Sequence, residues 1–146
     1  DGSRLHVAIP EVTAEHWAVN IRKHIAREKS LLQLCEMQVL TIEMADSLRA
    51  ALNSGKNILI SGSTQAGKTT LLNALANEIP GSERVITIEE VFELKPKLPD
   101  LIALQTKSEN LEGYGEISMR RLIKESLRMR PSRIVIGEIR EAESLD

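Results

Sequence analysis

The feature that most constrains the fold is a glycine-rich loop between an apolar run and an amphipathic stretch. The apolar run covers residues 57–60, and the loop follows it as Gly62-x-x-x-x-Gly67-Lys68-Thr69. Backbone N–H groups of such a loop turn inward around a phosphate, which requires glycine where a Cβ would collide or where φ is positive. The spacing therefore predicts a buried strand, a phosphate-binding loop and a helix, in that order.

Each part of this loop has a role in holding phosphate. The helix that follows directs its unpaired N–H groups and the positive end of its dipole at the phosphate. Lys68 supplies a charge to the β- and γ-phosphates, and the Thr69 hydroxyl is a ligand for Mg²⁺. The alternative is a Gly/Ser loop with a chance lysine, and the apolar helical face that follows argues against it. The expected nucleotide-binding residues are Gly62, Ser63, Thr64, Gln65, Ala66, Gly67, Lys68, Thr69 and Thr70.

Length and composition describe a globular chain. Its 146 residues are 42% hydrophobic and 27% charged, which suits one domain with a core. The net charge is −2 and there is one residue each of Trp, Tyr and Phe, so we expect no nucleic-acid partner. No apolar run approaches the roughly 18 residues of a membrane span, which predicts a soluble domain. Cys35 is alone, which excludes a disulfide within the chain.

The first forty residues predict a pair of strands and a linker. Residues 4–9 and 19–22 each alternate between apolar and polar side chains. Two strands are only marginally stable by themselves, so we expect residues 1–23 to form the C-terminal end of a small N-terminal α/β domain. Residues 24–40 are predicted to be a linker with a brief helix capped by Ser30.

From residue 41 onward, helical and strand patterns alternate. Thr41 is a predicted N-cap, and apolar residues recur after it at helical spacing until Gly55. Ser118 begins a second helix of this kind. Three further strands are predicted, at 85–88, 101–104 and 133–136. A strand, a helix and a strand within about 33 residues make a βαβ unit, which predicts a parallel sheet.

Carboxylates follow two of the predicted strands. Glu89 and Glu90 come directly after residues 85–88, and Glu138 comes shortly after residues 133–136. In parallel α/β sheets, ligands lie beyond the carboxyl ends of the strands, so we expect these acids on the same rim as the phosphate loop. Glu138 stands where phosphate-binding enzymes carry an acid, normally Asp, that holds Mg²⁺ through water. A solvated turn is the alternative for Glu89 and Glu90.

With these motifs, the chain resembles the secretion and pilus-assembly ATPases shared by type II and type IV secretion systems and type IV pili. The most specific likeness is R-M-R-P-x-R-I-x-x-G-E-x-R, with Glu in place of the usual Asp. Among the branches of the family, the chain is most similar to the tight-adherence (Flp-type) pilus ATPases. The stretches that carry the resemblance are residues 1–7, 62–70, 85–90, 119–120 and 127–140.

The resemblance implies a RecA-like P-loop NTPase core, with a parallel sheet and flanking helices, preceded by the end of a small N-terminal α/β domain. Residues 41–146 would be the first part of the ATPase domain, and the family's histidine box would lie beyond the last strand. The implied protein is a homo-hexamer that hydrolyses ATP with Mg²⁺ to drive pilus assembly or protein secretion. It would be cytoplasmic, peripheral to the inner membrane and bound to platform proteins there.

Carried over to matching positions, the resemblance gives roles to four side chains near the loop. Lys68 would contact phosphate, and Thr69 and Glu138 would hold Mg²⁺, the latter through water. Glu89 matches the family's acidic box and would be the general base that orients the attacking water.

The resemblance also concerns two arginines and two departures from the family pattern. Arg4 and Arg22 match N-terminal-domain arginines that neutralise phosphate charge, in some members across a subunit boundary. From their positions alone, a solvated strand edge is equally open. Glu90 stands where Asp is usual. Gln65 stands where many members have glycine, and a positive φ there would cost on the order of 1 kcal/mol.

Two other functions are compatible with the same motifs. A small P-loop phosphotransferase would need a phosphoryl acceptor and would be a monomer or dimer. A nucleotide-sensing assembly module would bind nucleotide and change conformation without turnover. A GTPase is disfavoured because the chain contains no N-K-x-D motif.

Overall fold

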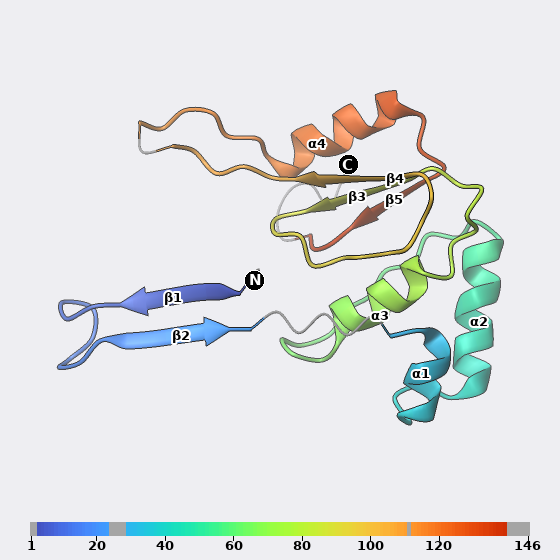
Figure 1. The fold of residues 1–146 in the computed structure, drawn as a ribbon, viewed down its shortest axis with the longest axis horizontal. Coiled ribbons are helices and arrows are strands. Elements are labelled where there is room, and N and C mark those ends of the chain that lie inside the picture. The colour runs from blue at the N-terminus through green and yellow to red at the C-terminus, as the bar shows by residue number, and fades with distance from the viewer. Residues whose placement is uncertain (1–2, 24–28, 111, 140–146) are drawn as a thin grey trace.

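The computed structural model describes residues 3–23, 29–110 and 112–139. These form a two-stranded hairpin and an α/β unit in which a sheet lies between helices (Figure 1). No helix within these ranges has the length and apolar character needed to cross a bilayer. The elements in chain order are β1 (Arg4–Ala8), β2 (Ala18–Arg22), α1 (Leu31–Glu36), α2 (Ile42–Asn53), α3 (Lys68–Ala76), β3 (Val85–Glu89), β4 (Leu101–Gln105), α4 (Met119–Ser126), the 3₁₀ turn η1 (Leu127–Met129) and β5 (Arg133–Ile136).

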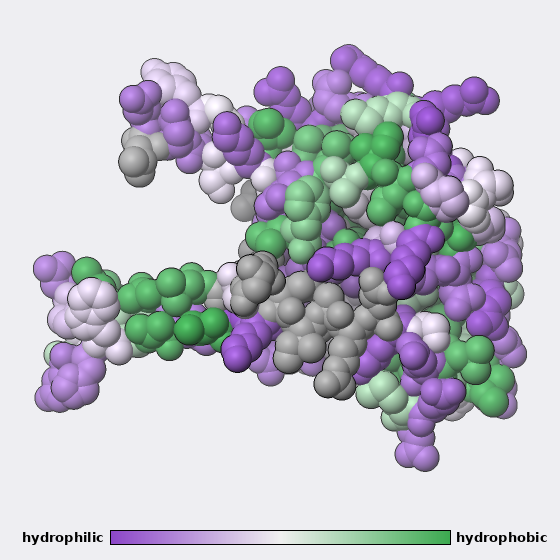
Figure 2. Space-filling model, in the orientation of Figure 1, coloured by the Kyte–Doolittle hydropathy of each residue, from purple (hydrophilic) through white to green (hydrophobic). Residues whose placement is uncertain are grey.

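β1 and β2 pair in antiparallel fashion, as the alternating patterns predict. Arg4 lies opposite Arg22 and Val7 lies opposite Val19. Directly opposed residues share one face of a sheet, so the hairpin has one apolar face. Its side chains are exposed, as Figure 2 also shows for the projecting hairpin. They are Leu5, Val7, Val19 and Ile21.

Side-chain caps begin three of the four α-helices. The hydroxyls of Ser30, Thr41 and Ser118 accept hydrogen bonds from backbone N–H groups in the first turns of α1, α2 and α4. This confirms the predicted starts of these helices. At α2, hydrogen bonds with its own backbone N–H and with the Thr41 hydroxyl hold the pKa of Glu43 below its usual value.

β3 is the central strand of a parallel sheet with the order β4-β3-β5. All five of its residues are buried. Val85 packs with the cluster that includes Ala76 and Ile79, while Ile86 and Ile88 pack in the cluster that contains side chains of α4. Because strand side chains alternate between faces, Glu89 shares the face of Val85, which is the α3 side of the sheet. The observed sheet with helices on both faces confirms the predicted α/β fold.

Residues 57–60, predicted as a buried strand, are extended but pair with no described strand. Leu59 is 84% exposed. β5 pairs only with β3, and residues 57–60 line a cleft together with β5 instead of bonding to it. An apolar run reports a tendency to be buried, whereas a ladder also needs the backbone of a neighbour, which a local pattern does not contain. The predicted βαβ unit is therefore wrong at its first strand.

Candidate active site

The loop residues lie at the N-terminus of α3. Gly67 is the N-cap residue and has φ 88°, in the left-handed region that favours glycine. It has no side chain, so none caps the first-turn N–H groups of α3, unlike those of α1, α2 and α4. Such N–H groups, together with the positive dipole end, suit an anion. Gln65 is also left-handed, with φ 63°.

Lys68 folds back over the loop. Its Nζ donates hydrogen bonds to the carbonyl oxygens of Gly62 and Ser63, at 2.9 and 2.8 Å. The ammonium group therefore lies inside the curve of the loop, where a phosphate would meet both it and the helix N-terminus. Thr69, the next residue, is half-buried.

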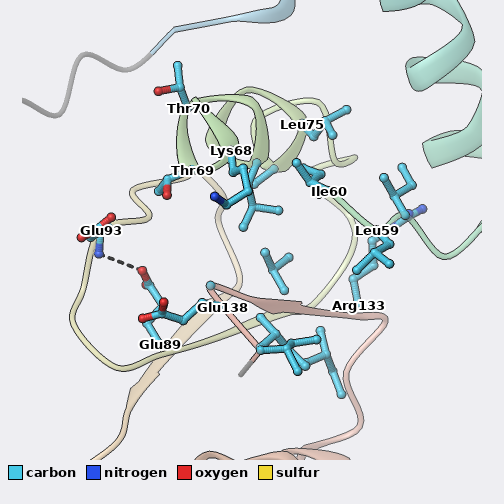
Figure 3. A pocket seen from close by; sticks show the side chains of 18 of the residues that line it. Leu59, Ile60, Lys68, Thr69, Thr70, Leu75, Glu89, Glu93, Arg133 and Glu138 are labelled. Carbon is cyan, nitrogen blue, oxygen red and sulfur yellow. Dashed lines mark hydrogen bonds between the residues drawn. The ribbon is translucent and has the colours of Figure 1, made fainter. Parts of the chain in front are cut away.

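A cleft of about 1140 Å³ joins this loop to the sheet. Figure 3 shows Lys68 and Thr69 on one side of the space and Glu89 and Glu138 on the other. These side chains come from the start of α3, the end of β3 and the residues just after β5. The predicted site residues that line the cleft are Arg22, Thr64, Gln65, Ala66, Gly67, Lys68, Thr69, Thr70, Glu89 and Glu138.

The remaining predicted residues are placed differently. Gly62 and Ser63 do not line the cleft, but their carbonyl oxygens hold Lys68. Arg22, at the end of the hairpin, does line it. The backbone of Arg4 lies opposite Arg22, and its side chain falls outside the described part of the chain.

Glu89 is buried at the floor of the cleft. Its side chain belongs to a residue only 2% exposed, and its Oε2 accepts hydrogen bonds from the backbone N–H groups of Glu93 and Leu94 at 2.7 and 2.9 Å. Two N–H donors fix the orientation of this carboxylate. The solvated turn considered for this pair is therefore wrong for Glu89, whereas Glu90 is exposed.

Gly137 is a site residue that the sequence patterns did not single out. A Cβ at this position would lie 3.0 Å from Cγ of Glu89, closer than such atoms normally approach. The glycine thus leaves the space that the Glu89 side chain occupies. The signal available in the sequence is its position between a buried strand and the acid Glu138.

These residues fit a nucleotide and a magnesium ion. Mg²⁺ is usually held in proteins by one or two oxygen groups together with substrate phosphates and waters. Thr69 and Glu138 supply a hydroxyl and a carboxylate at the cleft, and Lys68 supplies the cation for phosphate. No shift of the pKa of a site residue is needed for this fit, because a carboxylate and an ammonium are the ordinary charged forms at neutral pH.

Comparison with known proteins gives related sequences along nearly the whole chain. The family described as "Type II/IV secretion system protein" matches residues 4–146. A putative conjugal transfer protein of Mycobacterium tuberculosis is 35% identical over 143 residues, which is 98% of this chain and 41% of that protein. Conjugal transfer protein TrbB of Rhizobium radiobacter is 32% identical over 147 residues, or 99% of this chain and 43% of that protein.

A further relative and one solved structure come from type IV secretion systems. Protein PtlH of Bordetella pertussis is 41% identical over 102 residues, or 69% of this chain and 30% of that protein. The crystal structure of the VirB11 ATPase of Brucella suis, in complex with sulphate, has a TM-score of 0.58 and 29% identity. It is covered to 48% by 97% of this chain. The chain thus spans less than half the length of each of these proteins.

Proposed function

Because the chain belongs to the type II/IV secretion system protein family, we propose that it is the nucleotide-binding part of a RecA-like motor ATPase. The complete protein would hydrolyse ATP, as a homo-hexamer, to drive pilus assembly or protein secretion. The observation that carries this proposal is the single cleft that Lys68, Thr69, Glu89 and Glu138 line together. The tight-adherence branch stays a prediction, since the relatives above are conjugal transfer and type IV secretion proteins.

Binding of ATP begins at the loop. The first-turn N–H groups of α3 and the Lys68 ammonium would hold the phosphates, and Thr69 with Glu138 would hold Mg²⁺, the latter through water. When bound, Mg²⁺ neutralises charge on the phosphate oxygens. The VirB11 ATPase of Brucella suis was solved with sulphate, a tetrahedral anion similar to phosphate.

Hydrolysis requires a water molecule aligned with the terminal phosphate. Glu89 would orient this water and take its proton, because its carboxylate is fixed by two backbone N–H groups and lines the same cleft as Lys68. Burial excludes bulk water around the carboxylate, which strengthens its interactions with a bound reactant.

Arginine from the hairpin would complete the site. Arg22 lines the cleft and would meet the negative charge that spreads over the transferring phosphoryl group. Arg4, opposite Arg22 in the β1–β2 register, would act in the same region or across a subunit boundary. The motor would be cytoplasmic and bound to platform proteins at the inner membrane.

The test is Mg²⁺-dependent ATP hydrolysis by the complete protein. We expect Lys68→Ala and Glu138→Gln each to lower turnover by about 100-fold or more, since each removes a group that faces developing phosphate charge. The control is Lys124→Ala, which removes a cation from the exposed face of α4. A hexamer in the presence of nucleotide is expected from a mass measurement.

Two results would overturn the proposal. Wild-type turnover in both site variants would place hydrolysis elsewhere. ATP that stays intact for hours in a purified ring would instead favour a nucleotide-sensing module, and a monomer that phosphorylates an added acceptor would favour a phosphotransferase.

A further inference from the structure

A second hydrogen-bonded layer lies behind Glu89. The segment that follows β3 is irregular, so its backbone N–H and C=O groups need partners other than a ladder. Residues 93 and 94 give their N–H groups to Glu89. On the α3 side, the Asn73 amide holds the same segment, donating from Nδ2 to the Glu93 carbonyl at 3.2 Å and accepting at Oδ1 from the Lys95 N–H at 2.9 Å.

These bonds form a continuous connection from α3 to Glu89. The Glu93 residue is held at its carbonyl by Asn73 and at its N–H by the Glu89 carboxylate. Leu94, whose N–H is the second donor to Glu89, is itself buried between the two contacts of Asn73. A side-chain amide matches this pattern because it offers one donor and one acceptor to the backbone of an extended segment.

We propose that Asn73 is a positioning residue for Glu89. Through residues 93–95 it fixes the two N–H groups that orient the Glu89 carboxylate, and so couples that carboxylate to the helix that begins with Lys68 and Thr69. The inference rests on the proposed hydrolysis of ATP, in which Glu89 acts on water. Asn73 touches no reacting atom in this scheme, so its loss affects the chemical step rather than nucleotide binding.

The chain contains a matched control for this role. Asn77 lies one turn further along, just after α3, and its Oδ1 accepts from the Lys97 N–H at 3.0 Å. It is the same residue type on the same face, holding the same segment by the same kind of bond. Lys97 donates no printed bond to Glu89, and the contact lies beyond the residues that do.

The experiment compares Asn73→Ala with Asn77→Ala in the complete protein. We expect Asn73→Ala to lower kcat for ATP hydrolysis by about tenfold or more, a fraction of the contribution of a well-placed base, with KM within about twofold of wild type. Asn77→Ala is expected to change neither by more than about twofold. Asn73→Asp keeps the acceptor for Lys95 but loses the donor to Glu93, so an intermediate kcat is expected.

Amide hydrogen exchange supplies a readout that does not depend on turnover. In Asn73→Ala the Leu94 amide is expected to exchange about tenfold faster, because local opening of its segment becomes easier, while Asn77→Ala leaves that rate unchanged. The inference is overturned if both alanine variants lower kcat equally, or if kcat of Asn73→Ala falls without faster exchange at Leu94. Wild-type turnover with normal kcat in Asn73→Ala overturns the inference alone, whereas absence of turnover in wild type overturns the proposed function as well.

Discussion

Gln65 holds the phosphate loop in a backbone conformation that residues other than glycine rarely adopt. Its φ of 63° lies in the left-handed region, as the resemblance to a family with glycine at this position led us to consider. Side chains with a Cβ pay about 1 kcal/mol or more there, because Cβ approaches the following carbonyl oxygen. The loop therefore stores strain at one residue in the part of the chain that meets phosphate.

Replacing Gln65 by glycine tests this strain. We expect Gln65→Gly to raise the free energy of unfolding by up to about 1 kcal/mol, since relief of strain exceeds the entropy lost by a freer unfolded chain. The control is Thr64→Gly, at a neighbour without positive φ, which should lower stability by about 0.5–1 kcal/mol. Urea unfolding measures both. Equal destabilisation by the two glycines would show that Gln65 is unstrained.

At the scale of elements, an ion pair joins the beginnings of two sheet strands. Arg133, the first residue of β5, donates from Nε and Nη2 to the two carboxylate oxygens of Glu83, which lies just before β3. The two side chains are only 18% and 22% exposed. A planar, two-point pair of this kind holds geometry well, and loss of one partner leaves the other charge poorly solvated.

Glu83→Gln is expected to lower the free energy of unfolding by about 1–3 kcal/mol, because the Arg133 guanidinium keeps its burial and loses its counter-charge. The matched variant is Asp46→Asn, which removes an exposed carboxylate from the i,i+3 pair with Arg49. Its cost should be below about 0.5 kcal/mol. Chemical denaturation gives both values. Indistinguishable losses would mean that burial adds nothing to the Arg133–Glu83 pair.

The elements also differ in how well local sequence predicts them. β3, β5 and the capped helices were predicted because their signals, an apolar run or a hydroxyl before a periodic stretch, lie within a few residues. Residues 57–60 carry an equally apolar run, but their pairing depends on a partner elsewhere in the chain. At the site, the strand-end rule located Glu89 and Glu138. The supports of Glu89, namely Gly137 and Asn73, come from contacts between distant segments and have no comparable pattern.

At the scale of the whole molecule, the hairpin and the sheet should differ in stability. No residue of β2 is buried, whereas every residue of β3 is. A lone two-stranded hairpin is marginally stable in water, and its opening exposes little additional apolar surface. We expect the β1–β2 amides of residues 1–146 to exchange at least about 100-fold faster than those of β3. Exchange followed by NMR or mass spectrometry measures this, and equal protection would contradict it.

The bonds from Lys68 to its own loop have a consequence for ligand choice. The ammonium already holds two peptide carbonyls, so a ligand competes with the protein for this cation and gains only the difference. An uncharged nucleoside offers no oxygen superior to those carbonyls. A polyphosphate adds the attraction between opposite charges. The loop thereby sorts small molecules by their charge before any sugar or base is recognised.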